Sequence, residues 1–317
     1  MSGFTALPDL ALRTLGGSVV AANDESFAAR ESLIRPGRPA FQAHTFGPKG
    51  QVYDGWETRR RREPGHDWAM VRLGLPGVIR GVVIDTAWFK GNYPPHASVE
   101  AAAVEGYPTV AELEAAEWVE IVPRSALTGD AEHLFDVTDG RRHTHVRLNI
   151  FPDGGIARLR VHGEVRPDLT LYDGLGLDLA ALANGALVTG CSDEFYSSPN
   201  NVIAPGLARH QAEGWETARR RDDGNDWLLI RLAGAGVVKL AEIDTTNLLF
   251  NAPGSVSITG TADGDTWFEL LPRTRLQPDT SHRFRLGDAP AATHVRVDVY
   301  PDGGLARVRL HGLLSER

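Results

Sequence analysis

The chain has 317 residues, of which 42% are hydrophobic and 23% charged, and its formal net charge is −8. This length favours two domains, and the composition is that of a folded globular protein. The acidic balance argues against nucleic acid and anionic membranes as partners, since both attract basic surfaces. No apolar run approaches the roughly 20 residues that span a bilayer, and the N-terminal segment lacks a signal-peptide pattern, so we expect a cytoplasmic protein.

An internal duplication organises the sequence. Residues 55–62 read Gly-Trp-Glu-Thr-Arg-Arg-Arg-Arg and residues 214–221 read Gly-Trp-Glu-Thr-Ala-Arg-Arg-Arg, an offset of 159. Farther along, Pro-Asp-Gly-Gly at 152–155 recurs at 301–304 with an offset of 149. The first copy therefore carries an insertion between Asn92 and Trp118. Residues 109–117 of this insertion are rich in Ala, Glu and Leu and predict a short helix.

The end of each copy shows the periodicity of strands. Val146, Leu148 and Ile150 alternate with polar residues, and after the turn at 152–155 apolar residues alternate with Arg158, Arg160 and His162. A period of two predicts two strands, which we expect to form a hairpin with one buried and one polar face. Short strands between Gly and Pro turns predict an all-β fold, a tandem duplication of two β-sandwich or jelly-roll domains.

The domain boundaries follow from the repeat. We expect a first domain at residues 1–165, a linker containing a short helix at 166–185, and a second domain at 186–317. Two copies of this length indicate duplicated domains and not a solenoid, which needs three or more short units.

The repeated polar residues are the candidates for chemistry, because the common nucleotide, zinc and nucleophile motifs are absent from the sequence. Glu57 lies between an aromatic residue and a basic cluster, where it could act as a general base or form a salt bridge with neighbouring arginines. The run at Arg60 and Arg61 could present a fork to a carboxylate, or could be structural. Lys90 and Asn92 stand in a Gly-Asn-Tyr-Pro-Pro loop, where binding residues gather.

Other side chains favour structural roles. His143 and His145 share one face of a strand and could begin a metal site, but the second copy keeps only His294, so we favour a structural or surface role. The single cysteine, Cys191, fits a small buried apolar residue better than a nucleophile.

The two Gly-Trp-Glu-Thr-x-Arg-Arg-Arg segments, the Asp-Thr-x-x-Phe-x-Gly-Asn loop at 85–92 and the twin Pro-Asp-Gly-Gly turns resemble the allantoicase (allantoate amidinohydrolase) family over nearly the whole chain. The resemblance implies paired jelly-roll domains related to galactose-binding-like modules. It also implies a homo-oligomer, and hydrolysis of allantoate to ureidoglycolate and urea in purine breakdown.

Allantoate carries one carboxylate and two ureido groups, which suits arginine forks and Asp, Glu or Asn side chains. We expect the catalytic residues to be Glu57 or Glu216 as base and Lys90, or an arginine, in charge neutralisation. The expected substrate-binding residues are Arg60, Arg61, Asp85, Asn92, Arg220, Asp244 and Asn251. Leu249 and Phe250 replace Lys90 and Gly91 in the second copy, which leaves either a site in the first domain or one shared between the domains, and we favour the first domain.

Three alternatives stay open from the sequence. A divalent metal could assist the reaction, although the residues assign it no ligands. A related hydrolase could act on ureidoglycolate itself. A noncatalytic sandwich could bind carbohydrate or another small molecule, since fold does not fix function.

Overall fold

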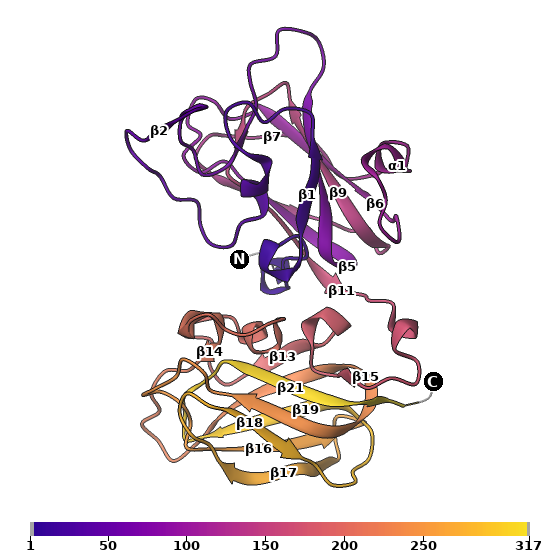
Figure 1. The fold of residues 1–317 in the computed structure, drawn as a ribbon, viewed down its shortest axis with the longest axis vertical. Helices are drawn as coiled ribbons and strands as arrows, with labels where there is room; N and C mark the ends of the chain where they lie inside the picture. Colours follow the sequence, from indigo (N-terminus) through magenta and orange to yellow (C-terminus); the bar gives the residue numbers. More distant parts are fainter. Residues whose placement is uncertain (1–2, 316–317) are drawn as a thin grey trace. The chain divides into compact units, whose positions relative to one another are not determined.

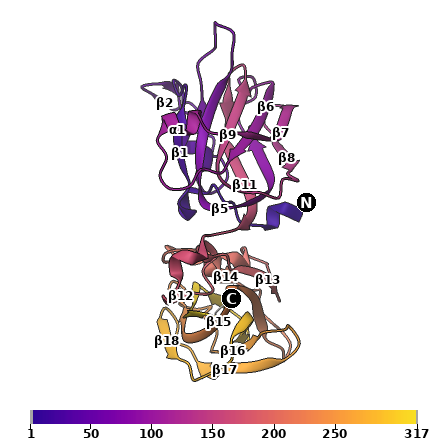
Figure 2. The same ribbon diagram turned by 90° about the vertical axis from the view of Figure 1, so that its right-hand side faces the viewer.

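The computed structural model describes residues 3–315, which divide into two compact units, Met1–Arg166 and Pro167–Arg317. Both units are built almost entirely from antiparallel strands (Figures 1 and 2). Residues 177–185 of the expected linker form part of unit 2, because β12 (Leu177–Asp178) pairs there with β21 (Arg307–Leu314).

Unit 1 contains eleven strands within the described residues, together with one short α-helix and three 3-10 helices. The strands are β1 (Ser18–Ala22), β2 (Phe46–Gly47), β3 (Gly50–Gln51), β4 (Trp56–Glu57), β5 (Asp67–Asp85), β6 (His96–Ala102), β7 (Val119–Ala126), β8 (Glu132–Asp136), β9 (Arg142–Phe151), β10 (Gly155–Ile156) and β11 (Arg158–Val165). The helices are η1 (Gly3–Ala6), η2 (Arg13–Leu15), η3 (Arg30–Ile34) and α1 (Val110–Glu114).

The long strand β5 belongs to both layers of the unit 1 sandwich. Its first half lies between β1 and β9, and the order continues to β6 and β7. Its second half lies between β11 and β8. The expected hairpin between residues 146–151 and 157–162 is therefore wrong, because β5 separates β9 from β11. Both strands pair with β5, and the turn at 152–155 carries the chain from one layer to the other.

The alternation within these strands is confirmed by burial. Val146, Leu148 and Ile150 on β9 and Leu159 and Val161 on β11 are all completely buried. Their side chains fill the space between the two layers, where sandwich cores lie. The neighbouring polar residues of β11 face away from this core.

The expected helix in the insertion of the first copy is α1. Thr109 caps it, since its hydroxyl accepts from the backbone N–H of Glu112 while the Glu112 carboxylate accepts from the backbone N–H of Thr109. Such a reciprocal capping box stabilises a helix that is too short to form by propensity alone.

Unit 2 repeats this arrangement. Its strands are β12, β13 (Leu187–Cys191), β14 (Trp215–Glu216), β15 (Asp226–Asp244), β16 (Ser255–Thr261), β17 (Trp267–Arg275), β18 (Ser281–Arg285), β19 (Ala292–Tyr300), β20 (Gly304–Leu305) and β21; its 3-10 helices are η4 (Leu169–Tyr172), η5 (Leu182–Asn184), η6 (Pro199–Ile203) and η7 (Gln211–Glu213). The strand β15 pairs with β19 and β13 through its first half and with β21 and β18 through its second. The predicted all-β fold, a tandem pair of sandwiches, is confirmed.

The two sequence signatures of each copy contact one another. In unit 1 the Thr58 hydroxyl accepts from the backbone N–H of Gly154 at 3.1 Å, and the Asp153 carboxylate accepts from the backbone N–H of Arg61 at 2.8 Å. Trp56 is completely buried and its indole N–H donates to the Asp24 carbonyl at 2.8 Å. Unit 2 repeats all three contacts. The signatures therefore hold the turn between the layers.

His143 and His145 are both buried on β9, with 2% of each residue exposed. Burial lowers the pKa of both rings, and the nearby Arg72 guanidinium adds to the effect at His145, whose pKa falls to about 4. Both histidines are therefore neutral at pH 7 in the folded protein.

Acid is expected to destabilise unit 1 through His145. An unfolded histidine has a pKa of about 6.5, so the unfolded chain binds this proton before the folded chain does. The neutral ring therefore contributes fully to the free energy of unfolding above pH 6.5. This contribution is lost as the pH falls toward 4. We expect wild-type unfolding near pH 5 to take up about one proton more than unfolding of His145→Gln. Urea unfolding midpoints between pH 7 and pH 5 measure this, and equal pH dependence of the two proteins would contradict it.

Candidate active site

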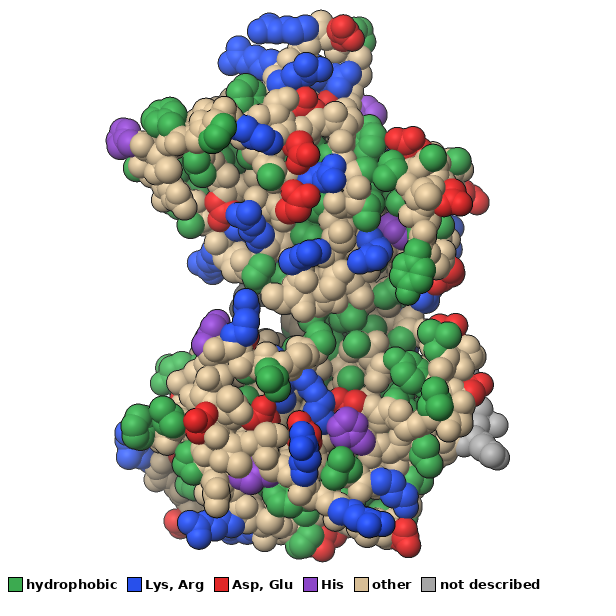
Figure 3. All heavy atoms as spheres, viewed as in Figure 1, with side chains coloured by type: hydrophobic (Ala, Val, Ile, Leu, Met, Phe, Trp, Pro, Cys, Tyr) green, Lys and Arg blue, Asp and Glu red, His purple; other side chains and the backbone are tan. Residues whose placement is uncertain are grey.

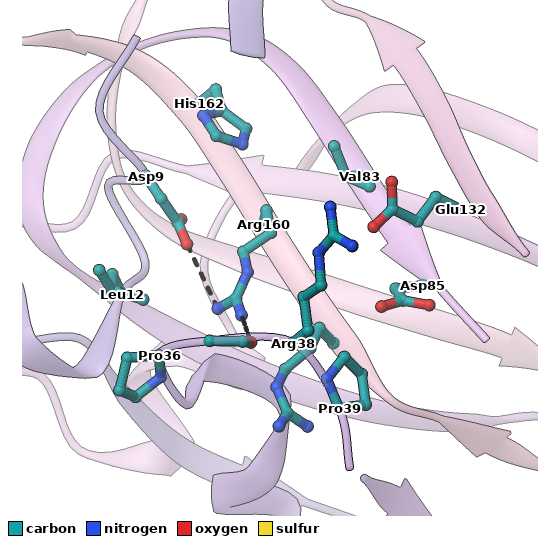
Figure 4. Close-up of a pocket in the computed structure, with 12 residues that line it drawn as sticks. Asp9, Leu12, Pro36, Arg38, Pro39, Val83, Asp85, Glu132, Arg160 and His162 are labelled. Atoms are coloured by element: carbon teal, nitrogen blue, oxygen red, sulfur yellow. Dashed lines mark hydrogen bonds and ion pairs between the residues drawn. The ribbon is translucent and has the colours of Figure 1, made fainter. Parts of the chain in front are cut away.

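A pocket of about 340 Å³ with several charged residues in its lining lies on the outer face of unit 1. Strand β11 contributes Arg158, Arg160 and His162, which point to one face because side chains alternate along a strand. Register places Asp85 of β5 directly between Arg158 of β11 and Glu132 of β8. The N-terminal segment and the loop after η3 form the remaining walls (Figure 4). The lining residues are Asp9, Leu12, Pro36, Gly37, Arg38, Pro39, Val83, Asp85, Glu132, Arg158, Arg160 and His162.

Asp9 and Arg160 form a buried ion pair at this pocket. The Asp9 carboxylate accepts from the backbone N–H groups of Val161 at 2.9 Å and Ala11 at 3.1 Å. Its other oxygen lies 3.5 Å from Arg160 Nη1, and neither of these two atoms makes a hydrogen bond within the described residues. Burial raises the pKa of Asp9 in spite of the nearby guanidinium. Arg160 Nη1 therefore contacts Asp9 through charge and makes no hydrogen bond of its own within the described residues.

Asp85 and Glu132 form the acidic side of the pocket, across from Asp9, with Arg160 between the two sides (Figure 4). Asp85 is 5% exposed, and its carboxylate accepts from the backbone N–H of Ala87 at 2.7 Å. Burial raises the pKa of Asp85, and the negative charge of Glu132 raises it further. A raised pKa suits a carboxyl group that takes part in proton transfer.

Arg38 lies on an exposed loop at the mouth of the pocket and has no ion pair or hydrogen bond to any other residue between 3 and 315. Arg160 holds this loop by donating to the Gly37 carbonyl at 2.9 Å. Arg158 holds the end of the same loop, because its guanidinium donates to Asp54 Oδ2 at 2.7 Å. The loop thus presents Arg38 as a charge free to meet an anion.

His162 has a defined tautomer. Its Nδ1 lies 2.8 Å from the Leu7 carbonyl, which can only accept, so Nδ1 carries the proton. In the neutral ring Nε2 is then an acceptor.

The corresponding face of unit 2 is built differently. Asp178 and Arg309 repeat the ion pair at 3.6 Å, but Arg309 also donates to the carbonyls of Val202, Ala204 and Gly206. The guanidinium that is partly free in unit 1 is therefore fully engaged in unit 2.

Three pocket positions also differ in charge between the units. Leu207 stands where unit 1 has Arg38, and Ser281 stands where it has Glu132. Glu242 replaces Val83 and forms an ion pair with Arg283 at 2.8 Å. The combination of a free arginine and two acidic groups thus belongs to unit 1.

The expected base Glu57 lies away from this pocket, in a second polar contact. Its buried carboxylate accepts from Asn92 Nδ2 at 2.7 Å, and burial raises its pKa while that hydrogen bond opposes the rise. Glu216 and Asn251 repeat the contact at 2.6 Å. The structure brings these expected residues together in pairs, one pair in each unit.

The arginine run separates into structural and exposed residues. Arg61 pairs with the buried Asp67 at 2.7 Å, and Arg220 pairs with Asp226 at 2.8 Å. Arg60 is exposed on the loop between β4 and β5, and Lys and Arg side chains gather at the end of unit 1 from which this loop projects (Figure 3).

The remaining expected residues lie apart from one another. Lys90 is exposed, 3.7 Å from Asp130. Asp244 is buried in unit 2, where its carboxylate accepts from the backbone N–H of Thr246 at 2.8 Å. Of all the expected site residues, Asp85 alone lines the pocket.

The sequence contained a signal for the pocket residues that were missed. Arg158, Arg160 and His162 recur as Arg307, Arg309 and His311, and they occupy the polar side of the alternation that predicted the strand. Three charged or titratable residues on one face of an antiparallel strand mark a polar surface. That Asp9, Arg38 and Glu132 lie against this surface is a matter of tertiary structure.

No group of three or more His, Cys, Asp and Glu side chains is arranged to hold a metal among residues 3–315. Burial raises the pKa of Cys191 to about 11, which disfavours the reactive thiolate. The described helices are all too short to cross a membrane.

Comparison with known proteins identifies the family. A sequence model described as the allantoicase repeat matches residues 8–166 and again 177–315. The chain belongs to the allantoicase family. A probable allantoicase of Nocardia farcinica is 59% identical over 317 residues, covering 99% of this chain and 96% of that protein. A probable allantoicase of Streptomyces coelicolor is 51% identical, covering 99% of this chain and 87% of the relative.

Solved structures agree. The crystal structure of allantoicase from Saccharomyces cerevisiae is 35% identical and matches with a TM-score of 0.83, covering 96% of this chain and 93% of that one. The resemblance to the allantoicase family drawn from the motifs is therefore confirmed, and so is the expected enzyme class, a hydrolase.

Proposed function

We propose that this chain converts allantoate and water into ureidoglycolate and urea, a step of purine breakdown, in the pocket of unit 1. Membership of the allantoicase family supports the reaction. The observation that carries the location is the pocket itself, which combines arginines with two acidic residues and has no equivalent charge set in unit 2. A cavity of about 340 Å³ is at the small end of ligand sites and suits a substrate of about a dozen non-hydrogen atoms.

The arginines would bind the substrate carboxylate. Arg38 has no partner within the described residues, so it can donate without breaking an existing contact, and Arg160 adds a second positive charge beside it. Guanidinium–carboxylate pairs of this kind are strong and directional. The ureido groups would then extend toward Asp85 and Glu132, whose oxygens accept from ureido N–H groups, and toward His162 Nε2.

The acidic pair would supply the proton transfers. Hydrolysis breaks the bond between the central carbon and one ureido nitrogen, the electron pair leaves with that nitrogen, and water supplies the new hydroxyl group. The departing nitrogen needs a proton and the water must lose one. We assign proton donation to Asp85, whose pKa is raised, and proton acceptance from water to the more exposed Glu132. The net proton change is zero.

Glu57 and Glu216 remain a second candidate for the base, with Lys90 neutralising charge. In favour of Glu57 are its burial, its raised pKa and the contact with Asn92. Against it stands the repetition of that contact in unit 2, which a structural role explains equally well. Asn251 contacts Glu216 and would serve this second candidate, and the ligand roles expected of Arg60, Arg61, Arg220 and Asp244 stay predictions.

Purified protein is expected to release one urea for each allantoate consumed, which a urea assay coupled to ureidoglycolate detection measures. Treatment with a chelator forms a second arm. Activity that is lost and then restored by a divalent cation would make the metal part of the mechanism, with the acidic residues as candidate ligands. No urea release with cations supplied would refute the proposed reaction.

We also propose that the protein is a cytoplasmic homo-oligomer. Unit 2 exposes Phe195, Tyr196, Leu249 and Phe250, by 68%, 62%, 56% and 99% respectively. Phe195 and Tyr196 contact each other edge to face, and an apolar patch that is contiguous at the surface marks an association site. The single cysteine in 317 residues fits a reducing compartment. Light scattering tests the association, since a monomer would have a mass of 34.4 kDa.

A further inference from the structure

Trp88 adopts a backbone conformation that an aromatic residue rarely takes. It stands three residues after Asp85, and its φ is +70°. This left-handed region is an outlier for bulky side chains and costs free energy, so surrounding contacts must maintain it. One of these contacts is to the Asp130 carboxylate, which accepts from the backbone N–H of Trp88 at 2.7 Å.

The side chain of Trp88 reaches the wall of the pocket from outside. Its indole N–H donates to the Pro39 carbonyl at 3.0 Å, and its ring stacks on Phe41 with centroids 5.2 Å apart and an angle of 24°. Pro39 lines the pocket and directly follows Arg38. Trp88 therefore connects the end of β5, which carries Asp85, to the loop that carries Arg38.

Unit 2 makes the same contact with a residue that fits the backbone better. Asn247 has a φ of +69°, its N–H donates to Asp279 at 2.8 Å, and its Nδ2 donates to the Ala208 carbonyl at 3.0 Å. Asparagine tolerates the left-handed region far better than tryptophan does. The unit that contains the pocket thus has the residue with the greater backbone cost.

The loop that Trp88 holds is also longer than its counterpart. Pro36 and Gly55 are 19 residues apart, whereas Pro205 and Gly214 are 9 apart. The additional residues include Phe41, which is 46% exposed in spite of its contact with the indole. A longer loop has more conformations to exclude, so holding Arg38 in one place requires an anchor near it.

We propose that Trp88 is a positioning residue for substrate binding: its hydrogen bond to Pro39 holds the loop so that Arg38 meets the substrate carboxylate. This inference rests on the proposed function of the pocket. Trp88 takes no part in the proton transfers, so its loss should weaken binding while leaving the chemical step intact.

The duplication supplies matched variants. Trp88→Gly removes the donor without straining the backbone, and is expected to raise KM for allantoate about 10-fold with kcat within about twofold. Trp88→Asn restores a donor that reaches the equivalent carbonyl in unit 2, and is expected to recover KM to within about threefold of wild type. Asn247→Gly is the control and should leave both constants unchanged. A wild-type KM in the Trp88→Gly variant would overturn the proposal. So would a Trp88→Asn variant whose KM is raised as much as that of Trp88→Gly.

A double variant tests whether Trp88 affects KM through Arg38. Adding Trp88→Gly to Arg38→Ala is expected to raise KM less than about twofold further, because the group being positioned is already absent. Full additivity would overturn the proposal. Should Trp88→Gly fail to fold by circular dichroism, Trp88→Phe, which keeps a ring on Phe41 but lacks the donor, takes its place.

The same data separate the two hypotheses. A wild-type KM in Arg38→Ala would refute the pocket as the substrate site, whatever the Trp88 variants show. If KM rises in the Arg38→Ala variant but stays at the wild-type value in the Trp88→Gly variant, only the role of Trp88 is refuted.

Discussion

Replacing Asp85 with asparagine is expected to lower kcat for allantoate by about 10² to 10⁴-fold, the usual contribution of a general acid or base. Asparagine cannot supply the proton that the departing urea nitrogen needs. Its side-chain oxygen can still accept from the backbone N–H of Ala87, as Asp85 does at 2.7 Å, so the fold should persist. Steady-state kinetics measures the loss, and the melting temperature checks the fold.

Two matched variants make this result specific. Asp244→Asn alters the equivalent residue of unit 2, which faces Ser281 where Asp85 faces Glu132, and should leave kcat within about threefold of wild type. Glu57→Gln tests the competing base. If Glu57→Gln abolishes activity in a folded protein while Asp85→Asn stays active, catalysis belongs to the Glu57–Asn92 contact and the pocket assignment is wrong.

Replacing Arg61 with alanine is expected to destabilise unit 1 by about 3 to 5 kcal/mol, because it leaves the buried Asp67 carboxylate without its cation. The side chain of Asp67 is 2% exposed, so in the folded protein its carboxylate depends on protein partners and not on water. The Asn23 side chain, which donates to Asp67 at 2.9 Å, compensates only part of the charge. Chemical denaturation of the purified variants measures the change in the free energy of unfolding.

The neighbouring Arg60 is the natural control for Arg61. It is exposed and forms no ion pair within residues 3–315, so Arg60→Ala should change stability by no more than about 0.5 kcal/mol. Equal effects of the two substitutions would contradict the structural assignment of Arg61. A large fall in kcat with unchanged stability in Arg61→Ala would instead support the expected ligand role.

The signatures that revealed the family owe their repetition largely to architecture. Gly55 has no room for a Cβ, since one would lie 2.6 Å from the Ile156 carbonyl oxygen, and Gly214 is equally close to the Leu305 carbonyl oxygen. Trp56 fills the core, Thr58 binds the turn between the layers, and Arg61 neutralises a buried carboxylate. Residues needed by the fold in both copies are repeated whether or not they act on substrate. Repetition therefore pointed to the family more surely than to the active site.

What could be read from the sequence alone is local in the chain. The alternation around Val146 and Leu159 and the helix after Thr109 each depend on residues within a few positions of one another, and the duplication shows in short motifs that recur along the chain; the structure confirms all three. Strand pairing depends on which faces must be buried and on register across separate strands, so β5 could come between β9 and β11 without any local trace. The pocket follows the same physics, because Asp9, Arg38, Glu132 and Arg160 are distant in sequence. The pairing of β11 and β8 with β5 brings Arg160 and Glu132 to one surface, and contacts of the N-terminal segment and of the loop after η3 with β11 add Asp9 and Arg38.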